Sequence, residues 1–143
     1  MKSKITLSII IPHLVGRDIL HECIDSIISN TNNVEYEIII VNNNCQDDSI
    51  KFIKNTFSEI IIVDSNKNKG YAGGCNLGAK HANGKFLFFL NNDTIITEKC
   101  INTLVEYIKK NNQISSVQPK IKNYYNKNNF DYAGASGGYI DYL

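Results

Sequence analysis

Four segments of the sequence place short polar or tight-turning residues directly after an apolar run. They are Pro12-His13-Leu14, Asn42-Asn43-Asn44, Ser65–Gly70 and Asn91-Asn92-Asp93. If the apolar runs are parallel strands of one sheet, these segments meet at its carboxyl edge, where open α/β sheets bind ligands. Amides, hydroxyls and tight turns suit hydrogen bonding to a sugar, a base or a phosphate, although loops of α/β proteins are commonly polar. The pattern predicts a ligand site, with a plain set of turns as the alternative.

The chemistry available for a phosphorylated ligand centres on Asp93. The two common glycine-based phosphate cradles are missing, because no G-x-G-x-x-G follows the first apolar run and no G-x-x-x-x-G-K-[ST] occurs. A divalent metal held by Asp93 would replace them. Mg²⁺ or Mn²⁺ needs about six oxygens and often takes only one or two from protein carboxylates, the rest coming from phosphates and water.

Strand and helix patterns alternate along the chain and would position these segments. Apolar runs predict strands at 7–11, 37–41, 59–63, 85–90 and 114–117. Helical spacing predicts helices at 17–30 and 71–84, a short helix capped by Asp47 or Asp48, and a helix capped by Thr97. This order predicts an α/β fold, with a mostly parallel sheet covered by helices on both faces.

Composition bounds the class of protein. The 143 residues are 43% hydrophobic and 20% charged, which predicts a globular chain with a sizeable core. A formal net charge of +1 gives no electrostatic case for nucleic-acid binding. No apolar run is long enough to span a bilayer. Four cysteines lie far apart without zinc-type spacing, which predicts reduced thiols in a cytoplasmic protein.

Four motifs in register carry a resemblance to a known family. LSIIIP, VNNNCQDDS, NKNKGYAGGCNLG and FLFFLNNDT resemble, in this order and spacing, family 2 glycosyltransferases with the GT-A fold, and most closely the rhamnosyltransferase-like branch. The resemblance covers about 5–122 and continues weakly into DYAGASGG. It implies a Rossmann-like donor-binding domain over 1–122. Residues 123–143 would then begin an acceptor-side region that is cut short.

The resemblance also assigns roles to residues. Nucleotide-sugar binding is implied for Pro12, His13, Asn42, Asp47, Gly70, Gly73, Gly74, Asn76, Asn91 and Asn92, and metal binding for Asp93. Three positions depart from the family pattern. Asn42 replaces an acid that meets the base, Asn91 replaces the first acid of D-x-D, and His13-Leu14 replaces an aromatic turn. An amide both donates and accepts hydrogen bonds, so the preferred base does not carry over.

The implied activity is transfer of a sugar from a nucleotide-diphosphate sugar to a glycan or lipid-linked acceptor, with inversion. Mg²⁺ or Mn²⁺ would stabilise the departing diphosphate, and a general base would deprotonate the acceptor. That base is expected beyond Leu143, since no motif assigns the role to Asp131 or Asp141. These 143 residues alone are therefore expected to bind nucleotide weakly and to turn over little or nothing.

Partners and location follow from the same reasoning. An apolar surface left open by missing residues would favour self-association. Because many relatives use lipid-linked acceptors, a cytoplasmic enzyme peripheral to the inner face of the membrane is compatible with the resemblance.

Two other functions stay open. The amides at Asn42 and Asn91 are compatible with a nucleotide- or sugar-binding module that has no catalytic activity. A nicotinamide-dependent oxidoreductase is disfavoured, because the glycine fingerprint is missing. Five tyrosines near the end of the chain would form an acceptor platform or, alternatively, a partly buried surface. They are Tyr124, Tyr125, Tyr132, Tyr139 and Tyr142.

Overall fold

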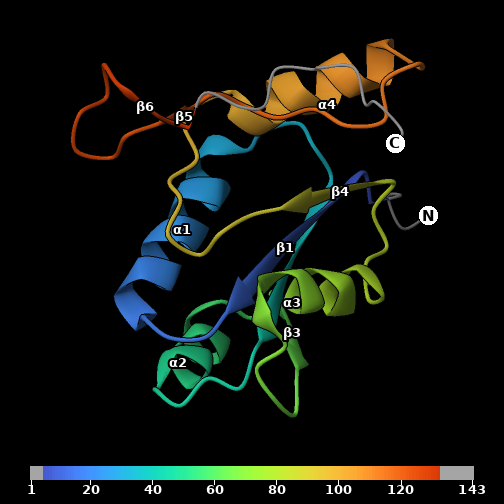
Figure 1. The fold of residues 1–143 in the computed structure, drawn as a ribbon. Coiled ribbons are helices and arrows are strands. Elements are labelled where there is room, and N and C mark those ends of the chain that lie inside the picture. The colour runs from blue at the N-terminus through green and yellow to red at the C-terminus, as the bar shows by residue number, and fades with distance from the viewer. Residues whose placement is uncertain (1–4, 133–143) are drawn as a thin grey trace, which may run out of the picture. The chain divides into compact units, whose positions relative to one another are not determined.

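The computed structural model describes residues 5–132, and the chain divides into two compact units, residues 1–102 and 103–143. The first unit holds a sheet with helices, and the second holds a small hairpin (Figure 1). Helix α4 (Cys100–Lys110) runs across the boundary. Within residues 5–132, no helix combines the length and apolar character needed to cross a membrane.

The sheet of the first unit is parallel throughout, with strand order β3-β2-β1-β4. Its strands are β1 (Leu7–His13), β2 (Tyr36–Asn42), β3 (Ile61–Asp64) and β4 (Phe86–Phe89). Every residue of β1 is buried, because this strand is central and covered on both faces. That position explains its continuous apolar run without alternation. The predicted mostly parallel sheet is confirmed.

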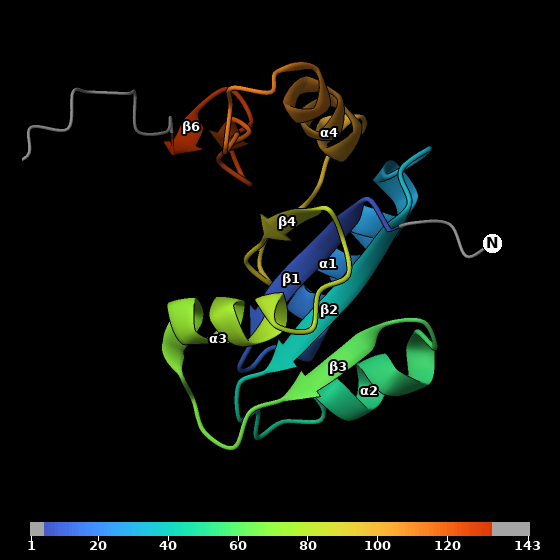
Figure 2. The same cartoon turned by 90° about the vertical axis from the view of Figure 1, so that its right-hand side faces the viewer.

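Helices cover both faces of this sheet. Helix α3 (Gly70–Ala79) packs on β1 and β2 from one side. Helices α1 (Arg17–Asn30) and α2 (Ser49–Thr56), which pack on each other, lie on the other side (Figure 2). The side under α3 has a buried core of Ile10, Ile39, Val41 and Val63.

Glycines allow α3 to approach the sheet closely. A Cβ atom at Gly74 would lie 2.8 Å from Cβ of Pro12, and one at Gly78 would overlap the Ile10 side chain. For Gly74, the structure shows close packing on β1.

The predicted helix 71–84 is wrong in its second half. Helix α3 ends at Ala79, and the following turn brings Gly84 against β1. The Gly84 N–H donates to Ser8 Oγ at 2.8 Å, and a Cβ at Gly84 would lie 2.5 Å from the Ser8 nitrogen. Gly84 is therefore required by contact with a neighbouring strand and does not terminate the helix.

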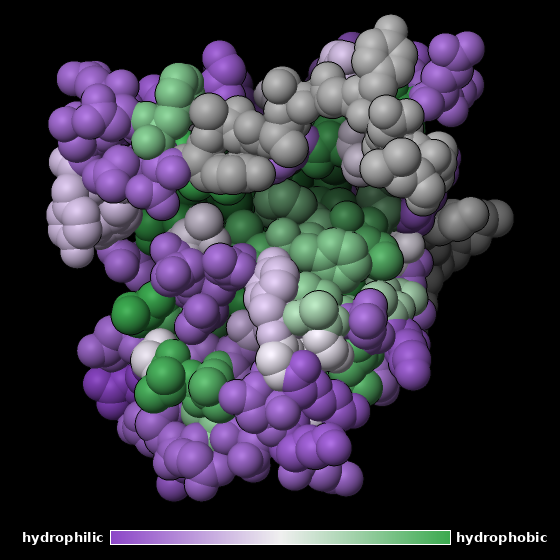
Figure 3. Space-filling model, in the orientation of Figure 1, coloured by the Kyte–Doolittle hydropathy of each residue, from purple (hydrophilic) through white to green (hydrophobic). Residues whose placement is uncertain are grey.

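The outer strands differ from their predictions in extent and burial. Strand β3 starts two residues later than the predicted 59–63, and β4 is shorter than the predicted 85–90. Strand β4 was expected to be buried, yet Leu87 and Phe89 are 44% and 45% exposed. An apolar run does not distinguish a central strand from an edge strand, and β4 is an edge. Figure 3 shows apolar surface in this part of the molecule.

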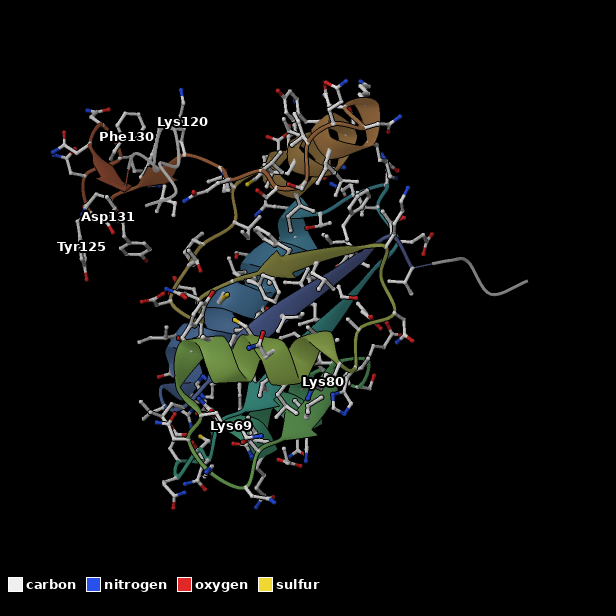
Figure 4. All side chains as sticks on the ribbon, turned by 45° about the vertical axis from the view of Figure 1, so that its right-hand side comes forward. Lys69, Lys80, Lys120, Tyr125, Phe130 and Asp131 are labelled. Atoms are coloured by element: carbon white, nitrogen blue, oxygen red, sulfur yellow. The ribbon has the colours of Figure 1, made fainter. Side chains whose placement is uncertain are left out.

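The second unit contains a structure that the sequence patterns did not predict. The predicted strand at 114–117 is wrong, since this stretch is irregular. Strands β5 (Ile121–Lys122) and β6 (Phe130–Tyr132) pair antiparallel instead. The turn between them is held by Asn123, whose Nδ2 donates to Asp131 at 3.1 Å. Tyr125 and Phe130 project from this region (Figure 4).

Part of the predicted acceptor-side segment lies outside the described residues. This applies to 133–143, including Asp141, Tyr139 and Tyr142. Among the described tyrosines of this segment, Tyr125 is 93% exposed.

Two helix starts also differ in detail. Asp48 occupies the residue before α2 but makes no side-chain cap, whereas Asp47 accepts the Ser49 N–H at 2.9 Å. The predicted cap at Thr97 is wrong, because α4 begins at Cys100 and Thr97 contributes only its carbonyl, to the Cys100 N–H.

Candidate functional site

The carboxyl ends of the strands meet at one edge of the sheet, as the sequence predicts. His13, Asn42 and Asp64 end β1, β2 and β3 and stand opposite one another in register. Strand β4 leads into Asn91-Asn92-Asp93 at the same edge. The chain therefore brings its polar segments together where α/β sheets bind ligands.

A pocket of about 280 Å³ opens at this edge. It is lined by Pro12, His13, Leu14, Val15, Asn43, Asn68, Gly70, Tyr71 and Asn92. Four of the sequence-predicted site residues are among these, namely Pro12, His13, Gly70 and Asn92. The volume lies near the lower end of the range for small-molecule sites, roughly 300–1,000 Å³.

Asn43 holds the floor of the pocket together, and the sequence analysis did not single it out. Its side chain is 5% exposed. Its Nδ2 donates to Asn68 Oδ1 at 2.9 Å and to the Gly70 carbonyl at 3.2 Å, while its Oδ1 accepts the Lys69 N–H at 2.8 Å. Three hydrogen bonds from one buried amide fix the loop before α3 to the end of β2.

Asn68 is a second pocket residue whose role the sequence pattern does not predict. Its Oδ1 accepts the Asn43 amide and also the Gly70 N–H, at 2.8 Å. Gly70 itself has φ +68°, a left-handed conformation that favours glycine. No hydrogen bond is recorded for Asn68 Nδ2 within the described part of the chain, so this donor is available to a ligand. The signal in the sequence was the polar loop 65–70, which did not reveal which side chain faces the pocket.

His13 lies at the pocket wall with its ring buried, being 1% exposed. Its Nδ1 is 3.0 Å from Asn92 Nδ2, which links the end of β1 to the segment after β4. Burial lowers the pKa of His13, and the nearby Asp47 opposes that shift only in part. The imidazole is therefore held in its neutral form near neutral pH.

Asp47 and Asn42 fix the loop after β2 and do not line the pocket. Asp47 accepts hydrogen bonds from the Cys45 thiol, from Ser49 and from the Gly16 N–H. These bonds hold the pKa of the Asp47 carboxyl well below its usual range. Asn42 donates to Asp64 Oδ1 at 2.7 Å and accepts the Cys45 N–H at 2.9 Å.

The remaining predicted residues also lie off the pocket wall. Gly73 and Gly74 sit in α3, where a Cβ on Gly73 would lie 2.6 Å from the Lys69 side chain. Asn76 is exposed on the same helix. Figure 4 shows Lys69 and Lys80 at the two ends of α3.

The segment after β4 is more open. Asn91 has an exposed side chain, and its carbonyl accepts the Thr94 hydroxyl at 2.5 Å. Asp93 is exposed. The negative charge of Asp93 reaches the pocket residue Tyr71, whose pKa is raised to about 12 by burial first, then by Cys75, and also by Asp93.

The residues present fit a hard metal ion shared with a ligand. Among residues 5–132, the one cluster of three His, Cys, Asp or Glu side chains close enough to hold a metal is His13, Cys45 and Asp47, so Asp93 stands outside any protein cage. One exposed carboxylate beside a pocket matches the way Mg²⁺ or Mn²⁺ is held partly by substrate phosphates.

The fold and this edge site define the class of an α/β domain with a pocket of mixed polar and apolar lining at the carboxyl edge of its sheet. The model of the family "Glycosyl transferase family 2" matches residues 8–137. This chain therefore belongs to glycosyl transferase family 2, and its sheet is that of the GT-A fold.

Relatives with curated names are similar over most of the chain. A poly(ribitol-phosphate) beta-glucosyltransferase of Bacillus spizizenii is 28% identical over 110 residues, covering 73% of this chain and 17% of the relative. The poly(ribitol-phosphate) beta-N-acetylglucosaminyltransferase TarP of Staphylococcus aureus is 29% identical over 110 residues, covering 74% of this chain and 34% of TarP. The chain thus spans about a third or less of the length of these relatives.

Solved structures support the fold. S. aureus TarS in complex with UDP has a TM-score of 0.66 at 19% identity, covering 73% of this chain and 32% of that one. The complex of TarS with UDP-GlcNAc has a TM-score of 0.64 at 16% identity, covering 73% and 31%. At these identities the likeness concerns the fold alone.

Proposed function

We propose that this chain is the donor-binding part of a glycosyltransferase that takes a sugar from a nucleotide-diphosphate sugar. The acceptor is a glycan or a lipid-linked acceptor, and transfer proceeds with inversion. The observation that carries the proposal is the pocket at the carboxyl edge of the sheet, lined by both polar and apolar side chains, in a chain that belongs to glycosyl transferase family 2.

In this proposal the nucleoside occupies the pocket between the end of β1 and the start of α3. The free Nδ2 of Asn68 donates to a carbonyl of the base, and Tyr71 provides an aromatic surface beside it. Gly70 begins α3 at the pocket, and a helix N-terminus favours the negative charge of a diphosphate. Asn43 acts indirectly, by holding Asn68 and Gly70 in place.

The diphosphate extends toward the segment after β4 in the same proposal. There Asp93 binds Mg²⁺ or Mn²⁺ together with phosphate oxygens, and Asn91 and Asn92 flank it. Such an ion stabilises the charge that develops on the departing diphosphate. Asn42, Asp47, Gly73, Gly74 and Asn76 serve the site by shaping its surroundings or by contacts with a bound donor.

The names of the relatives guide the choice of donor. TarP is named for N-acetylglucosamine transfer, and TarS has been solved with UDP and with UDP-GlcNAc. UDP is therefore the nucleotide we expect to bind. A rhamnosyl donor stays a prediction from the resemblance.

Calorimetric titration with UDP, dTDP and GDP, each with and without Mn²⁺, tests the proposal. We expect one nucleotide to bind in preference, and Mn²⁺ to strengthen its binding. A folded protein that binds none of the three would contradict a donor site in this chain.

A second function is favoured by one observation. Asn42 uses each end of its amide for one bond within the protein, which leaves fewer groups for a base than a free amide would offer. A nucleotide- or sugar-binding module without catalysis is compatible with that arrangement. Donor hydrolysis or transfer by the intact protein distinguishes the two, since a pure binding module shows neither.

A further inference from the structure

Three side chains with different metal-binding atoms converge beside the pocket. His13 ends β1, while Cys45 and Asp47 lie in the loop between β2 and α2. One ligand atom from each lies within 4.8 Å of the others. Asp93 is not a member of this cluster.

The His13 ring carries an unused buried nitrogen. Its Nδ1 faces Asn92, but Nε2 has no hydrogen-bond partner although the residue is 1% exposed. Leaving a buried polar atom unpartnered destabilises a folded protein, and such atoms are rare. As placed, Asn92 Nδ2 faces His13 Nδ1 and donates to the Val15 carbonyl at 3.4 Å, which puts the ring proton on Nε2. A half-turn of the Asn92 amide gives up the long bond to Val15, presents the amide oxygen to Nδ1–H and leaves the lone pair on Nε2. This is how imidazole ligands of metals are usually oriented.

We propose that His13, Cys45 and Asp47 form a binding site for Zn²⁺, separate from the donor-site metal at Asp93. A thiolate, an imidazole and a carboxylate are the ligands that zinc takes in proteins, whereas Mg²⁺ and Mn²⁺ prefer oxygen. The site goes beyond the proposed transferase function and does not depend on it. The three residues lack the close spacing typical of zinc motifs, so the sequence pattern does not predict this site.

The geometry requires the ligand atoms to rearrange. In tetrahedral coordination, a zinc–sulfur bond of about 2.3 Å and a zinc–nitrogen bond of about 2.0 Å place the two ligand atoms about 3.5 Å apart. Atoms that lie up to 4.8 Å apart must therefore approach by about 1 Å, while Cys45 Sγ and Asp47 Oδ1, at 2.8 Å, must move apart. Cys45 and Asp47 lie in a loop that is only partly buried, which can supply this movement.

Binding exchanges one proton for the metal. The Cys45 thiol donates to Asp47 Oδ1 at 2.8 Å, so the thiol proton occupies the place that the ion would take. When Zn²⁺ binds, that proton leaves to solvent, and the thiolate and the carboxylate balance the two positive charges. Asp47 keeps its bonds to Gly16 and to the Ser49 N–H. A water molecule completes the fourth position from the exposed side.

The ion would join the end of β1 to the loop that follows β2. Because it binds only the folded arrangement, it would stabilise the protein by mass action. His13 also lines the pocket and contacts Asn92, so the site lies next to the donor pocket without using its free groups.

Titration of the full chain with Co²⁺ under a non-thiol reductant tests this site. We expect one equivalent to bind with a thiolate-to-cobalt charge-transfer absorption band, and Zn²⁺ to displace it. The band should vanish in Cys45→Ser and persist in the matched control Cys100→Ser. Zn²⁺ should raise the melting temperature of wild type and Cys100→Ser, but not that of Cys45→Ser.

Other results would overturn the proposal. These are no band in the wild type, a band that persists in Cys45→Ser, or unchanged Co²⁺ affinity in His13→Gln. Cys45 is partly exposed, so its serine variant should fold, which circular dichroism checks. Mn²⁺-dependent UDP binding measured on Cys45→Ser separates this proposal from the donor site, because loss of zinc should leave that binding in place.

Discussion

The two sides of the carboxyl edge are built differently. On the β2 side, Asn43, Asn68 and Asp47 are tied by hydrogen bonds to backbone and side chains of neighbouring loops. On the β4 side, Asp93 is exposed and Asn91 contributes only its carbonyl. Under the proposed function, the rigid β2 side would hold the nucleoside, and the open β4 side would receive a cation that arrives with its phosphates.

The largest expected effect comes from breaking the rigid side. Asn43→Ala removes three hydrogen bonds from a buried amide, each worth about 1 kcal/mol. We expect the free energy of unfolding to fall by about 2–3 kcal/mol in urea denaturation and UDP affinity to fall about tenfold or more. The exposed Asn55→Ala is the control and should stay within about 0.5 kcal/mol of wild type. Equal stability of the two variants would show that Asn43 does not hold the loop.

The fold was largely predictable for a physical reason. Central parallel strands need apolar residues on both faces, so LSIII and EIIIV could be assigned from composition alone. The sequence does not reveal which strands lie at the edge, and for that reason the exposure of Leu87 and Phe89 was missed. The β5/β6 hairpin was not predicted, because strands of two and three residues are too short to show an alternation of apolar and polar residues.

The sequence predicted where the site lies better than it predicted which side chains contact one another there. Pro12, His13, Gly70 and Asn92 were expected and line the pocket. The run Asn42-Asn43-Asn44 could not reveal that Asn43 is the buried one, because the direction of each side chain depends on where β2 ends. The role of Gly84 was not predictable for a similar reason, because Gly84 contacts Ser8 of β1, which lies 76 residues away in the sequence.

A smaller effect is expected from Asn68→Asp, which keeps the acceptor for Gly70 but removes the free donor. If Asn68 Nδ2 donates to the base, UDP affinity should fall by about tenfold, the value of one good hydrogen bond. Asn66→Asp adds the same charge in the same exposed loop and is the matched control. Calorimetric titration of both variants with UDP separates the effect of the lost hydrogen bond on affinity from the effect of the added charge. A similar loss in the two would assign the effect to charge alone.

Asp47 gives the rigid side a pH dependence. Its pKa is lower in the folded protein, so it contributes stability above the unfolded value of about 3.9, and this contribution is lost as the pH falls below that value. Between about pH 6 and about pH 3, the urea midpoint of the wild type should fall more than that of Asp47→Asn. Parallel curves for the two proteins would contradict the role of the Asp47 carboxylate in holding this loop.

The smallest expected effect is a gain in Mn²⁺ affinity on the β4 side of the carboxyl edge. Asn91→Asp adds a second carboxylate near Asp93, and an exposed charge of this kind is worth about 0.5–1 kcal/mol. Mn²⁺ should then bind about two- to fivefold more tightly in the presence of UDP, as measured by titration. Asn55→Asp, which carries the same charge on α2, should leave Mn²⁺ affinity unchanged. An equal gain in that control would mean that only net charge matters.

The most direct test of the donor site is a calorimetric titration of UDP with and without Mn²⁺, on the wild type and on Asp93→Ala. The account predicts that Mn²⁺ strengthens UDP binding in the wild type, and that Asp93→Ala loses this strengthening while unfolding at the same urea concentration. Equal strengthening by Mn²⁺ in both proteins would contradict a metal site at Asp93. Absence of UDP binding in the folded wild type would contradict the proposed UDP site.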